Sequence, residues 1–161
     1  MNNSDTAVEE LVRTLGETLR SFGYRMGTAE SCTGGLVACT LTNVSGSSDW
    51  FEGGVVAYDN RVKMKLLQVP EAVLVAHGAV SRECVEAMVL GLGNLLGVAV
   101  GLAISGIAGP GGGTAEKPVG MVWIAWKFGE RIWSRCFHFT GSRLDIKEQS
   151  MRAAIAELLL Q

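Results

Sequence analysis

The pattern of apolar and polar positions predicts helices alternating with strands through most of the chain. Apolar residues repeat at helical spacing over residues 8–22, and Thr6 and Glu9 have the spacing of a capping box at the start of that helix. A strand is expected over residues 24–29, and a second helix over about 34–44. The polar turn between these two elements is therefore a strand-to-helix junction.

The same pattern continues to the C-terminus. The remaining predicted elements are a strand at 53–58, a short helix carrying 63–67, a short helical stretch after Pro70, a long helix from its cap at Ser81 to Leu96, strands at 98–104, 121–128 and 132–139, and a C-terminal helix with Met151, Ile155, Leu158 and Leu159 in register. Gly91 and Gly93 lie inside the long helix, where glycine costs stability, so we expect close packing against a neighbour there.

Strands that alternate with helices and then form a hairpin predict an α/β fold, a three-layer α/β/α sandwich with a mixed β-sheet. The unbroken apolar run at 98–104 fits a strand buried on both faces. No repeat or linker interrupts the pattern, so residues 1–161 are expected to form one domain. In such sheets ligands bind beyond the carboxyl ends of the strands. Three polar, glycine-bearing segments fall there: 30–35, 58–63 and 105–114.

Composition narrows the class of protein. The chain has 161 residues, of which 48% are hydrophobic and 21 are glycine, about twice the usual share of glycine. That much apolar surface excludes a disordered chain. The formal net charge of −2 gives no basic surface for nucleic acid or an anionic membrane. The first ten residues are polar and acidic, which argues against a secretory signal, so a cytoplasmic protein is expected.

The cysteines and histidines predict no metal site. They are scattered and lack the paired spacing of zinc ligands or of a disulfide framework. They are Cys32, Cys39, Cys84, Cys136, His77 and His138. We therefore expect reduced, largely buried thiols, and neither a metal nor a cofactor.

The first polar segment places Ser31 and Cys32 at a strand-to-helix turn, ahead of Thr33, Gly34 and Gly35. A serine there can be exposed beside free backbone N–H groups that bind phosphate or an oxyanion. Alternatively, Ser31 or Thr33 only caps the helix. A thiol nucleophile at Cys32 is the weaker option, because neither histidine has an evident claim to activate it.

The second segment carries Tyr58, Asn60 and Lys63 at a strand end. One helical turn could bring the tyrosine and the lysine to the same crevice. A neutral lysine can act as general base to a serine, but its pKa must first fall from about 10.4 through burial or positive neighbours. The alternative is an ordinary exposed lysine beside Arg61 and Lys65.

The third segment is a glycine-rich stretch at 105–114 followed by Lys117, Pro118, Val119 and Gly120. Glycine lets backbone N–H groups approach a ligand and form an anion-binding nest. The spacing matches neither a Walker loop nor a dinucleotide fingerprint. A merely flexible loop is the alternative, although two prolines and a strand on either side favour an ordered one.

At these segments the chain resembles the CinA C-terminal domain family. The resemblance lies in Ala29–Gly35, in the Tyr58-x-Asn60-x-x-Lys63 spacing, and in Ser105–Thr114 with Lys117–Gly120, and it extends over nearly the whole chain. The family's activity is nicotinamide mononucleotide deamidase. The resemblance therefore implies hydrolysis of the carboxamide of nicotinamide mononucleotide, a small nucleotide substrate, to nicotinic acid mononucleotide and ammonia, without a cofactor.

The resemblance also implies site residues. Ser31 would be the nucleophile, and Lys63 and Tyr58 would assist it. The residues expected to bind substrate are Cys32, Thr33, Gly34, Gly35, Asn60, Ser105, Gly106, Gly109, Gly112, Gly113, Thr114 and Arg143. Where the family commonly has Gly-Asp-Arg and then a second arginine, this chain has Gly141-Ser142-Arg143 and then Lys147, so Arg143 lacks the usual neighbouring carboxylate.

Two other functions remain open at this point. One is a non-catalytic nucleotide-binding or competence-associated module, and the other is an amidase for a different pyridine amide. Retention of Ser31, Tyr58 and Lys63 together favours catalysis, because binding alone would not require all three. A homo-oligomer is also expected, since an exposed edge strand needs cover.

Overall fold

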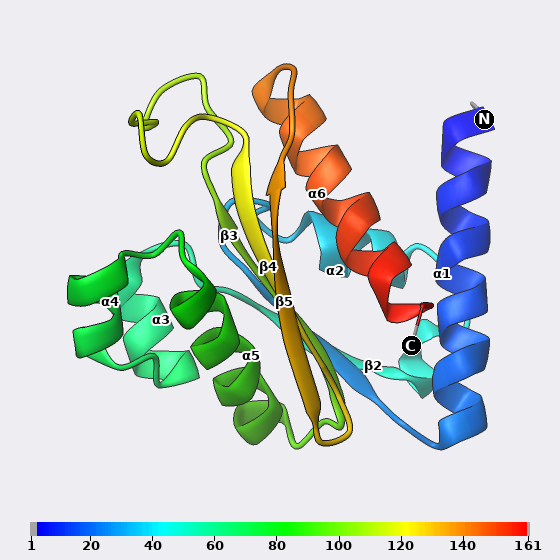
Figure 1. Ribbon diagram of the computed structural model, residues 1–161. Coiled ribbons are helices and arrows are strands. Elements are labelled where there is room, and N and C mark those ends of the chain that lie inside the picture. The colour runs from blue at the N-terminus through cyan, green and yellow to red at the C-terminus, as the bar shows by residue number, and fades with distance from the viewer. Residues whose placement is uncertain (1–2, 161) are drawn as a thin grey trace.

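The computed structural model describes residues 3–160 and shows a sheet with helices on both faces (Figure 1). Met1, Asn2 and Gln161, the ends of the predicted domain, lie outside the described residues. The elements are α1 (Asn3–Phe22), β1 (Met26–Glu30), α2 (Leu36–Thr42), the 3-10 helix η1 (Ser47–Asp49), β2 (Phe51–Val56), α3 (Asn60–Leu67), α4 (Glu71–His77), α5 (Arg82–Leu96), β3 (Val100–Gly106), β4 (Met121–Phe128), β5 (Arg131–His138) and α6 (Arg143–Leu158).

The five strands form one mixed sheet in the order β2-β1-β3-β4-β5. Strand β1 is parallel to both β2 and β3, whereas β3, β4 and β5 pair antiparallel. All five residues of β1 are buried, as are six of the seven in β3. The predicted α/β fold with a mixed sheet is confirmed. The strand expected at 98–104 is present two residues further along.

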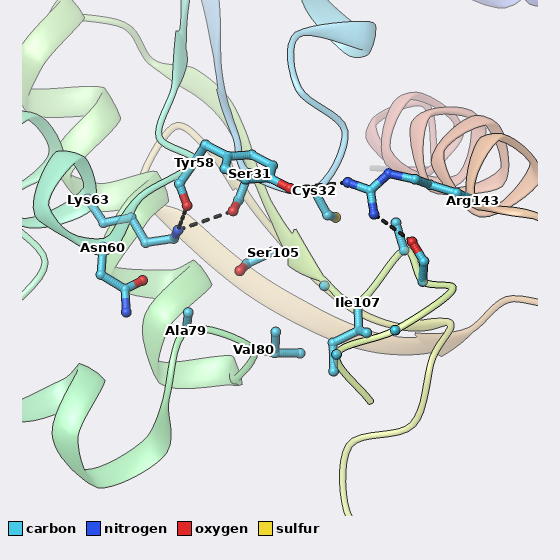
Figure 2. A pocket seen from close by; sticks show the side chains of 15 residues that line it. Ser31, Cys32, Tyr58, Asn60, Lys63, Ala79, Val80, Ser105, Ile107 and Arg143 are labelled. Atoms are coloured by element: carbon cyan, nitrogen blue, oxygen red, sulfur yellow. Dashed lines mark hydrogen bonds between the residues drawn. The ribbon is translucent and has the colours of Figure 1, made fainter. Parts of the chain in front are cut away.

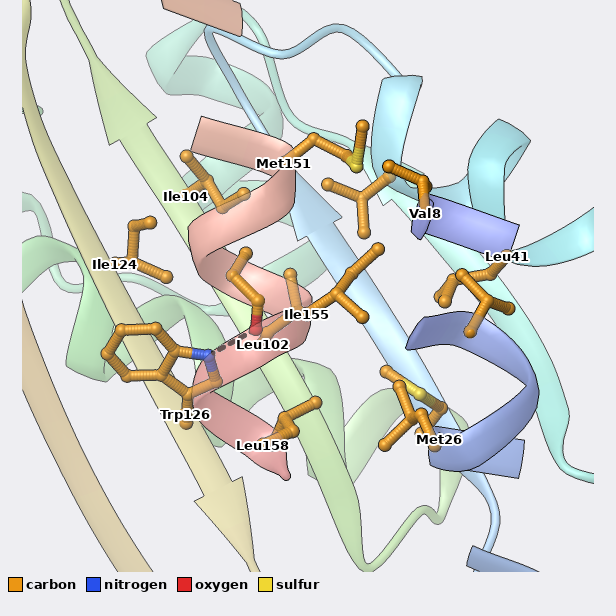
Figure 3. Close-up of a cluster of buried hydrophobic side chains, with 14 of the residues drawn as sticks. Val8, Met26, Leu41, Leu102, Ile104, Ile124, Trp126, Met151, Ile155 and Leu158 are labelled. Carbon is orange, nitrogen blue, oxygen red and sulfur yellow. Dashed lines mark hydrogen bonds between the residues drawn. The ribbon is translucent and has the colours of Figure 1, made fainter. Parts of the chain in front are cut away.

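Helices α1, α2 and α6 cover one face of the sheet, and α3, α4 and α5 lie on the other (Figure 1). On the first face, Leu102 and Trp126 of the sheet pack with Ile155 and Leu158 of α6 (Figure 3). The buried indole N–H of Trp126 donates to the Ala154 carbonyl at 2.8 Å. The sheet therefore has a separate apolar core on each side, which is the predicted sandwich. No helix within residues 3–160 has both the length and the apolar composition to cross a membrane.

The predicted capping box at Thr6 is wrong. Helix α1 already includes Asn3, so Thr6 lies inside the helix. Polar and acidic residues are favoured in the first turn of a helix because of its partial positive charge. The polar residues before Val8 are therefore compatible with a helix that begins at Thr6 and with one that already includes Asn3. A capping box does begin α6, where the Ser142 hydroxyl accepts from the Asp145 N–H and the Asp145 carboxylate accepts from the Ser142 N–H.

The connections place a crevice at the carboxyl end of β1. The chain leaves β1, crosses one face through α2 to β2, and returns across the other face through α3, α4 and α5 to β3. Neighbouring strands that connect over opposite faces leave an opening between them. Ser31 follows β1 directly and Gly106 ends β3, so both lie at this opening.

Gly91 and Gly93 on α5 differ in how closely neighbouring atoms approach them. A Cβ on Gly91 would lie 1.8 Å from the carbonyl oxygen of Leu67, the last residue of α3, whereas one on Gly93 would first meet the flexible Lys127 side chain at 3.4 Å. We expect Gly91→Ala to lower the free energy of unfolding by about 1–3 kcal/mol through overpacking. Gly93→Ala should leave it unchanged or raise it by up to about 1 kcal/mol. Denaturant unfolding of both variants checks this, and equal effects would contradict it.

Candidate active site

A buried lysine faces Ser31 at the crevice. Lys63 on α3 is 1% exposed, and its Nζ lies 3.1 Å from Ser31 Oγ (Figure 2). The same nitrogen donates to the carbonyl oxygens of Ala57 at 2.8 Å and Tyr58 at 3.0 Å. The alternative of an ordinary exposed lysine is therefore wrong.

The surroundings of Lys63 favour an uncharged amine. Burial lowers the pKa of Lys63 from its ordinary value of 10.5. A neutral amine has two N–H donors and one lone pair. The carbonyls of Ala57 and Tyr58 take up two donors, which leaves the lone pair for the hydroxyl of Ser31. This geometry suits removal of a proton from Ser31.

A short turn after β2 carries Lys63 to this position. Asp59 caps α3 by accepting from the Arg61 N–H at 2.8 Å. The helix thus starts within a few residues of the strand end, and Lys63, in its first turn, reaches back to the carbonyls of Ala57 and Tyr58. The backbone at Ser31 is fixed as well, because the Ser31 N–H donates to the Ile104 carbonyl at 2.9 Å.

Glu30, immediately before Ser31, caps α2 from inside the protein. Its carboxylate is 1% exposed and accepts from the N–H groups of Gly35 at 3.0 Å, Val37 at 3.1 Å and Ala38 at 2.8 Å. A carboxylate suits the positive end of a helix. The α2 terminus is therefore not free to bind an anion.

The capping role considered for Ser31 or Thr33 is wrong, because Gly35 holds the N-cap position and makes no side-chain cap. Gly34 and Gly35 have φ of 63° and 96°, the left-handed region that favours glycine. They turn the chain so that Glu30 can reach the helix. Among residues 3–160, the N–H groups of Cys32 and Thr33 make no hydrogen bond to another residue, which leaves them as the donors beside Ser31.

Ser31 and Lys63 line a pocket of about 280 Å³. The predicted site residues that line it are Ser31, Cys32, Tyr58, Asn60, Lys63, Ser105, Gly106, Gly109, Gly112 and Arg143. The predicted substrate contacts outside its lining are Thr33, Gly34, Gly35, Gly113 and Thr114. The lining residues that we did not predict are Ala79, Val80, Ile107, Ala108 and Gly111. Ile107, Ala108 and Gly111 belong to the glycine-rich motif and could have been included, whereas Ala79 and Val80 carry no chemical group that would mark them.

Tyr58 and Arg143 form a bridge beside the pocket. Arg143 donates through Nη2 to the Tyr58 hydroxyl at 3.1 Å and through Nη1 to the Gly109 carbonyl at 2.6 Å (Figure 2). The phenol of Tyr58 is thus directed toward Arg143, and the backbone carbonyl of Tyr58 is what contacts Lys63. The bridge joins α6, the glycine-rich loop and the end of β2.

Cys32 lines the pocket but is a poor nucleophile. Burial raises the pKa of its thiol to about 11, so the reactive thiolate is scarce at neutral pH. Ser31 beside Lys63 is the better candidate. Residues 3–160 hold no group of three or more His, Cys, Asp or Glu side chains suited to a metal ion.

Comparison with known proteins identifies the family. The profile described as "CinA C-terminal domain" matches residues 8–161. The chain belongs to this family. A protein of Pseudomonas putida named nicotinamide-nucleotide amidohydrolase PncC is 47% identical over 94% of this chain and 95% of its own length. One of the same name from Enterobacter agglomerans is 42% identical over 97% of this chain and 98% of its own length. A CinA-like protein of Desulfotalea psychrophila is 45% identical, but the chain spans 36% of that protein.

Solved structures agree with this assignment. A CinA superfamily protein from Escherichia coli superimposes with a TM-score of 0.93 at 33% identity, covering 99% of this chain and 92% of that one. The competence damage-inducible protein A of Klebsiella pneumoniae gives 0.92 at 35% identity, covering 96% of each chain. The family resemblance and the fold expected from it are confirmed. The homo-oligomer and the cytoplasmic location stay predictions.

Glu30 offers a test of how the Ser31 turn is held. In Glu30→Gln, one acceptor oxygen is replaced by an N–H donor that faces the start of α2. We expect the free energy of unfolding to fall by about 2–3 kcal/mol, and the Val37 and Ala38 amides to exchange faster. The control is Glu52→Gln, whose carboxylate is exposed and paired with Arg25, and which should change stability by about 1 kcal/mol at most. Unchanged exchange at Val37 and Ala38 would contradict the cap.

Proposed function

We propose that this protein hydrolyses the carboxamide of nicotinamide mononucleotide to nicotinic acid mononucleotide and ammonia. The observation that carries the proposal is the contact of 3.1 Å between Lys63 Nζ and Ser31 Oγ at the pocket, with two carbonyls holding the amine. The substrate is supported by the two relatives named nicotinamide-nucleotide amidohydrolase, which match over nearly their full length. Ser31 is the nucleophile and Lys63 the general base.

In the first half-reaction, Ser31 Oγ attacks the carboxamide carbon as Lys63 accepts its proton. The N–H groups of Cys32 and Thr33 stabilise the oxyanion, a contribution of about 3 kcal/mol per donor in comparable enzymes. When the intermediate collapses, Lys63 passes the proton to the leaving nitrogen, which departs as ammonia. In the second half-reaction, water attacks the acyl-enzyme, Lys63 accepts its proton and returns it to Ser31. The acid product is released.

The rest of the pocket binds the nucleotide. We assign the phosphate to Arg143 and the glycine-rich loop, where Gly109 and Gly112 both have left-handed backbone that a side chain would strain. Tyr58 orients the catalytic pair through its backbone carbonyl, and its hydroxyl holds Arg143 in place. Asn60 and Ser105 line the pocket between these ends and are assigned to the substrate's polar groups.

The catalytic pair is tested by two substitutions. Ser31→Ala should lower kcat for ammonia release by roughly four orders of magnitude or more, because no nucleophile remains. Lys63→Arg keeps the charge but supplies no neutral amine, so kcat should fall roughly 10²–10⁴-fold. Substantial activity of Ser31→Ala would remove Ser31 as nucleophile.

Thermal unfolding of both variants controls for loss of fold. Free nicotinamide and the dinucleotide, assayed beside nicotinamide mononucleotide, distinguish an amidase for another pyridine amide. A wild-type protein that binds the mononucleotide without releasing ammonia would instead indicate a binding module.

The pH dependence follows from the buried amine. The active form of Lys63 is neutral and its pKa lies below 10.5, so kcat/KM should rise with pH and level off above that lowered pKa. The pyridinium ring of the substrate adds a fixed positive charge, which disfavours the ammonium further. The pKa seen in kcat should therefore lie below the one seen in kcat/KM. A rate profile that falls as pH rises through this range would contradict the assignment of Lys63 as base.

A further inference from the structure

Lys117, which the reaction above does not use, joins the two walls of the pocket. Its Nζ donates to the backbone carbonyl of His77 at 2.6 Å, across 40 positions of sequence. Resting on the proposed function, we propose that Lys117 is a positioning residue that holds the glycine-rich loop against the segment after α4 and so sets the affinity for the nucleotide. Lys117 is absent from the pocket lining, so it acts through the walls that it connects.

On the loop side, Lys117 is presented by a closed turn. The Thr114 N–H donates to the Lys117 carbonyl at 2.8 Å, and the Lys117 N–H donates to the Thr114 hydroxyl at 3.0 Å. Gly113 fits tightly before this turn, because a Cβ there would lie 2.7 Å from the Val119 nitrogen. Gly113 and Thr114, which we expected to contact substrate, thus build the turn that carries Lys117.

On the other side, the ammonium meets the C-terminal end of α4. His77 is the last residue of that helix, and a cation suits the partial negative charge of its carbonyls. The chain then turns at Gly78, whose carbonyl accepts from the Ser81 hydroxyl at 2.8 Å. Ala79 and Val80, between these two hydrogen bonds, form a second wall of the pocket beside the glycine-rich loop.

The glycine-rich loop is therefore fixed by a cation at each side. Arg143 holds its Gly109 carbonyl from α6, and Lys117 ties it to α4. Without the second contact, both walls gain freedom, and a smaller fraction of molecules has the pocket ready for substrate. The apparent dissociation constant rises in inverse proportion to that fraction. Chemistry at Ser31 and Lys63 is untouched once substrate is bound, so KM changes and kcat does not.

The experiment compares Lys117→Met and Lys117→Arg with Lys127→Met. Lys127 is a matched control, because its half-buried Nζ donates to the Ala99 and Gly129 carbonyls at a turn away from the pocket. We expect Lys117→Met to raise KM for nicotinamide mononucleotide about tenfold, as the loss of a charged hydrogen bond implies, with kcat within about twofold. Lys117→Arg, which retains a donor, should restore most of the affinity.

Amide exchange tests the contact without substrate. Lys117→Met should speed exchange of the hydrogen-bonded amides of Gly78 and Thr114, one on each wall, and Lys127→Met should speed only that of Gly129. Unchanged exchange at Gly78 and Thr114 would overturn the proposal, as would an equal rise in KM for Lys127→Met. If the wild type releases no ammonia, the proposed function fails, while the exchange result still decides whether Lys117 holds the walls.

Discussion

The burial of one amine against one hydroxyl is the constraint on which the rest of the site depends. Taking Lys63 out of water disfavours its charged form, and the two carbonyls that accept its N–H hydrogen bonds orient the lone pair toward Ser31. Both conditions require α3 to be held close to Ser31, and α3 packs on α5. Helix α5 holds α3 in this position, because Gly91 has no side chain and lets α5 approach the Leu67 carbonyl at the end of α3. A missing Cβ in the neighbouring helix thus helps to keep the lysine buried.

The Glu30 carboxylate at the start of α2 limits where an anion can bind. The turn after β1 looks from sequence like a place for a phosphate, because it leads into a helix N-terminus. Glu30 already occupies that terminus with its own carboxylate, so a second anion there would meet like charge. The nucleotide phosphate is therefore assigned across the pocket, at Arg143 and the glycine-rich loop. Within the described turn at Ser31, the N–H groups of Cys32 and Thr33 remain for the much smaller oxyanion of the proposed reaction.

The pattern of apolar and polar positions was sufficient to predict the layers of the fold and the three strand ends that form the crevice. The run at 98–104 could be recognised because β3 is buried on both faces. The detailed roles could not be predicted, because they depend on which atom faces which. Tyr58 was expected to assist Ser31, and the group of Tyr58 that contacts Lys63 is its backbone carbonyl. Gly113 and Thr114 share a motif with pocket residues but lie outside the pocket lining, and Ala79 and Val80 carry no chemical group that would mark them.

Tyr58 links the two ends of the pocket through its two polar groups. Its carbonyl fixes the amine of Lys63, and its hydroxyl fixes the guanidinium of Arg143, which we assign to the phosphate. In the proposed reaction, one residue just after β2 therefore contacts both the base and the group assigned to the phosphate. Under the proposed function, a substrate that lacks the phosphate would leave Arg143 without its anion, and the pocket would lose binding energy far from the scissile bond. Selection for a mononucleotide over free nicotinamide would follow from this arrangement, because the proposed catalytic pair would contact the carboxamide alone.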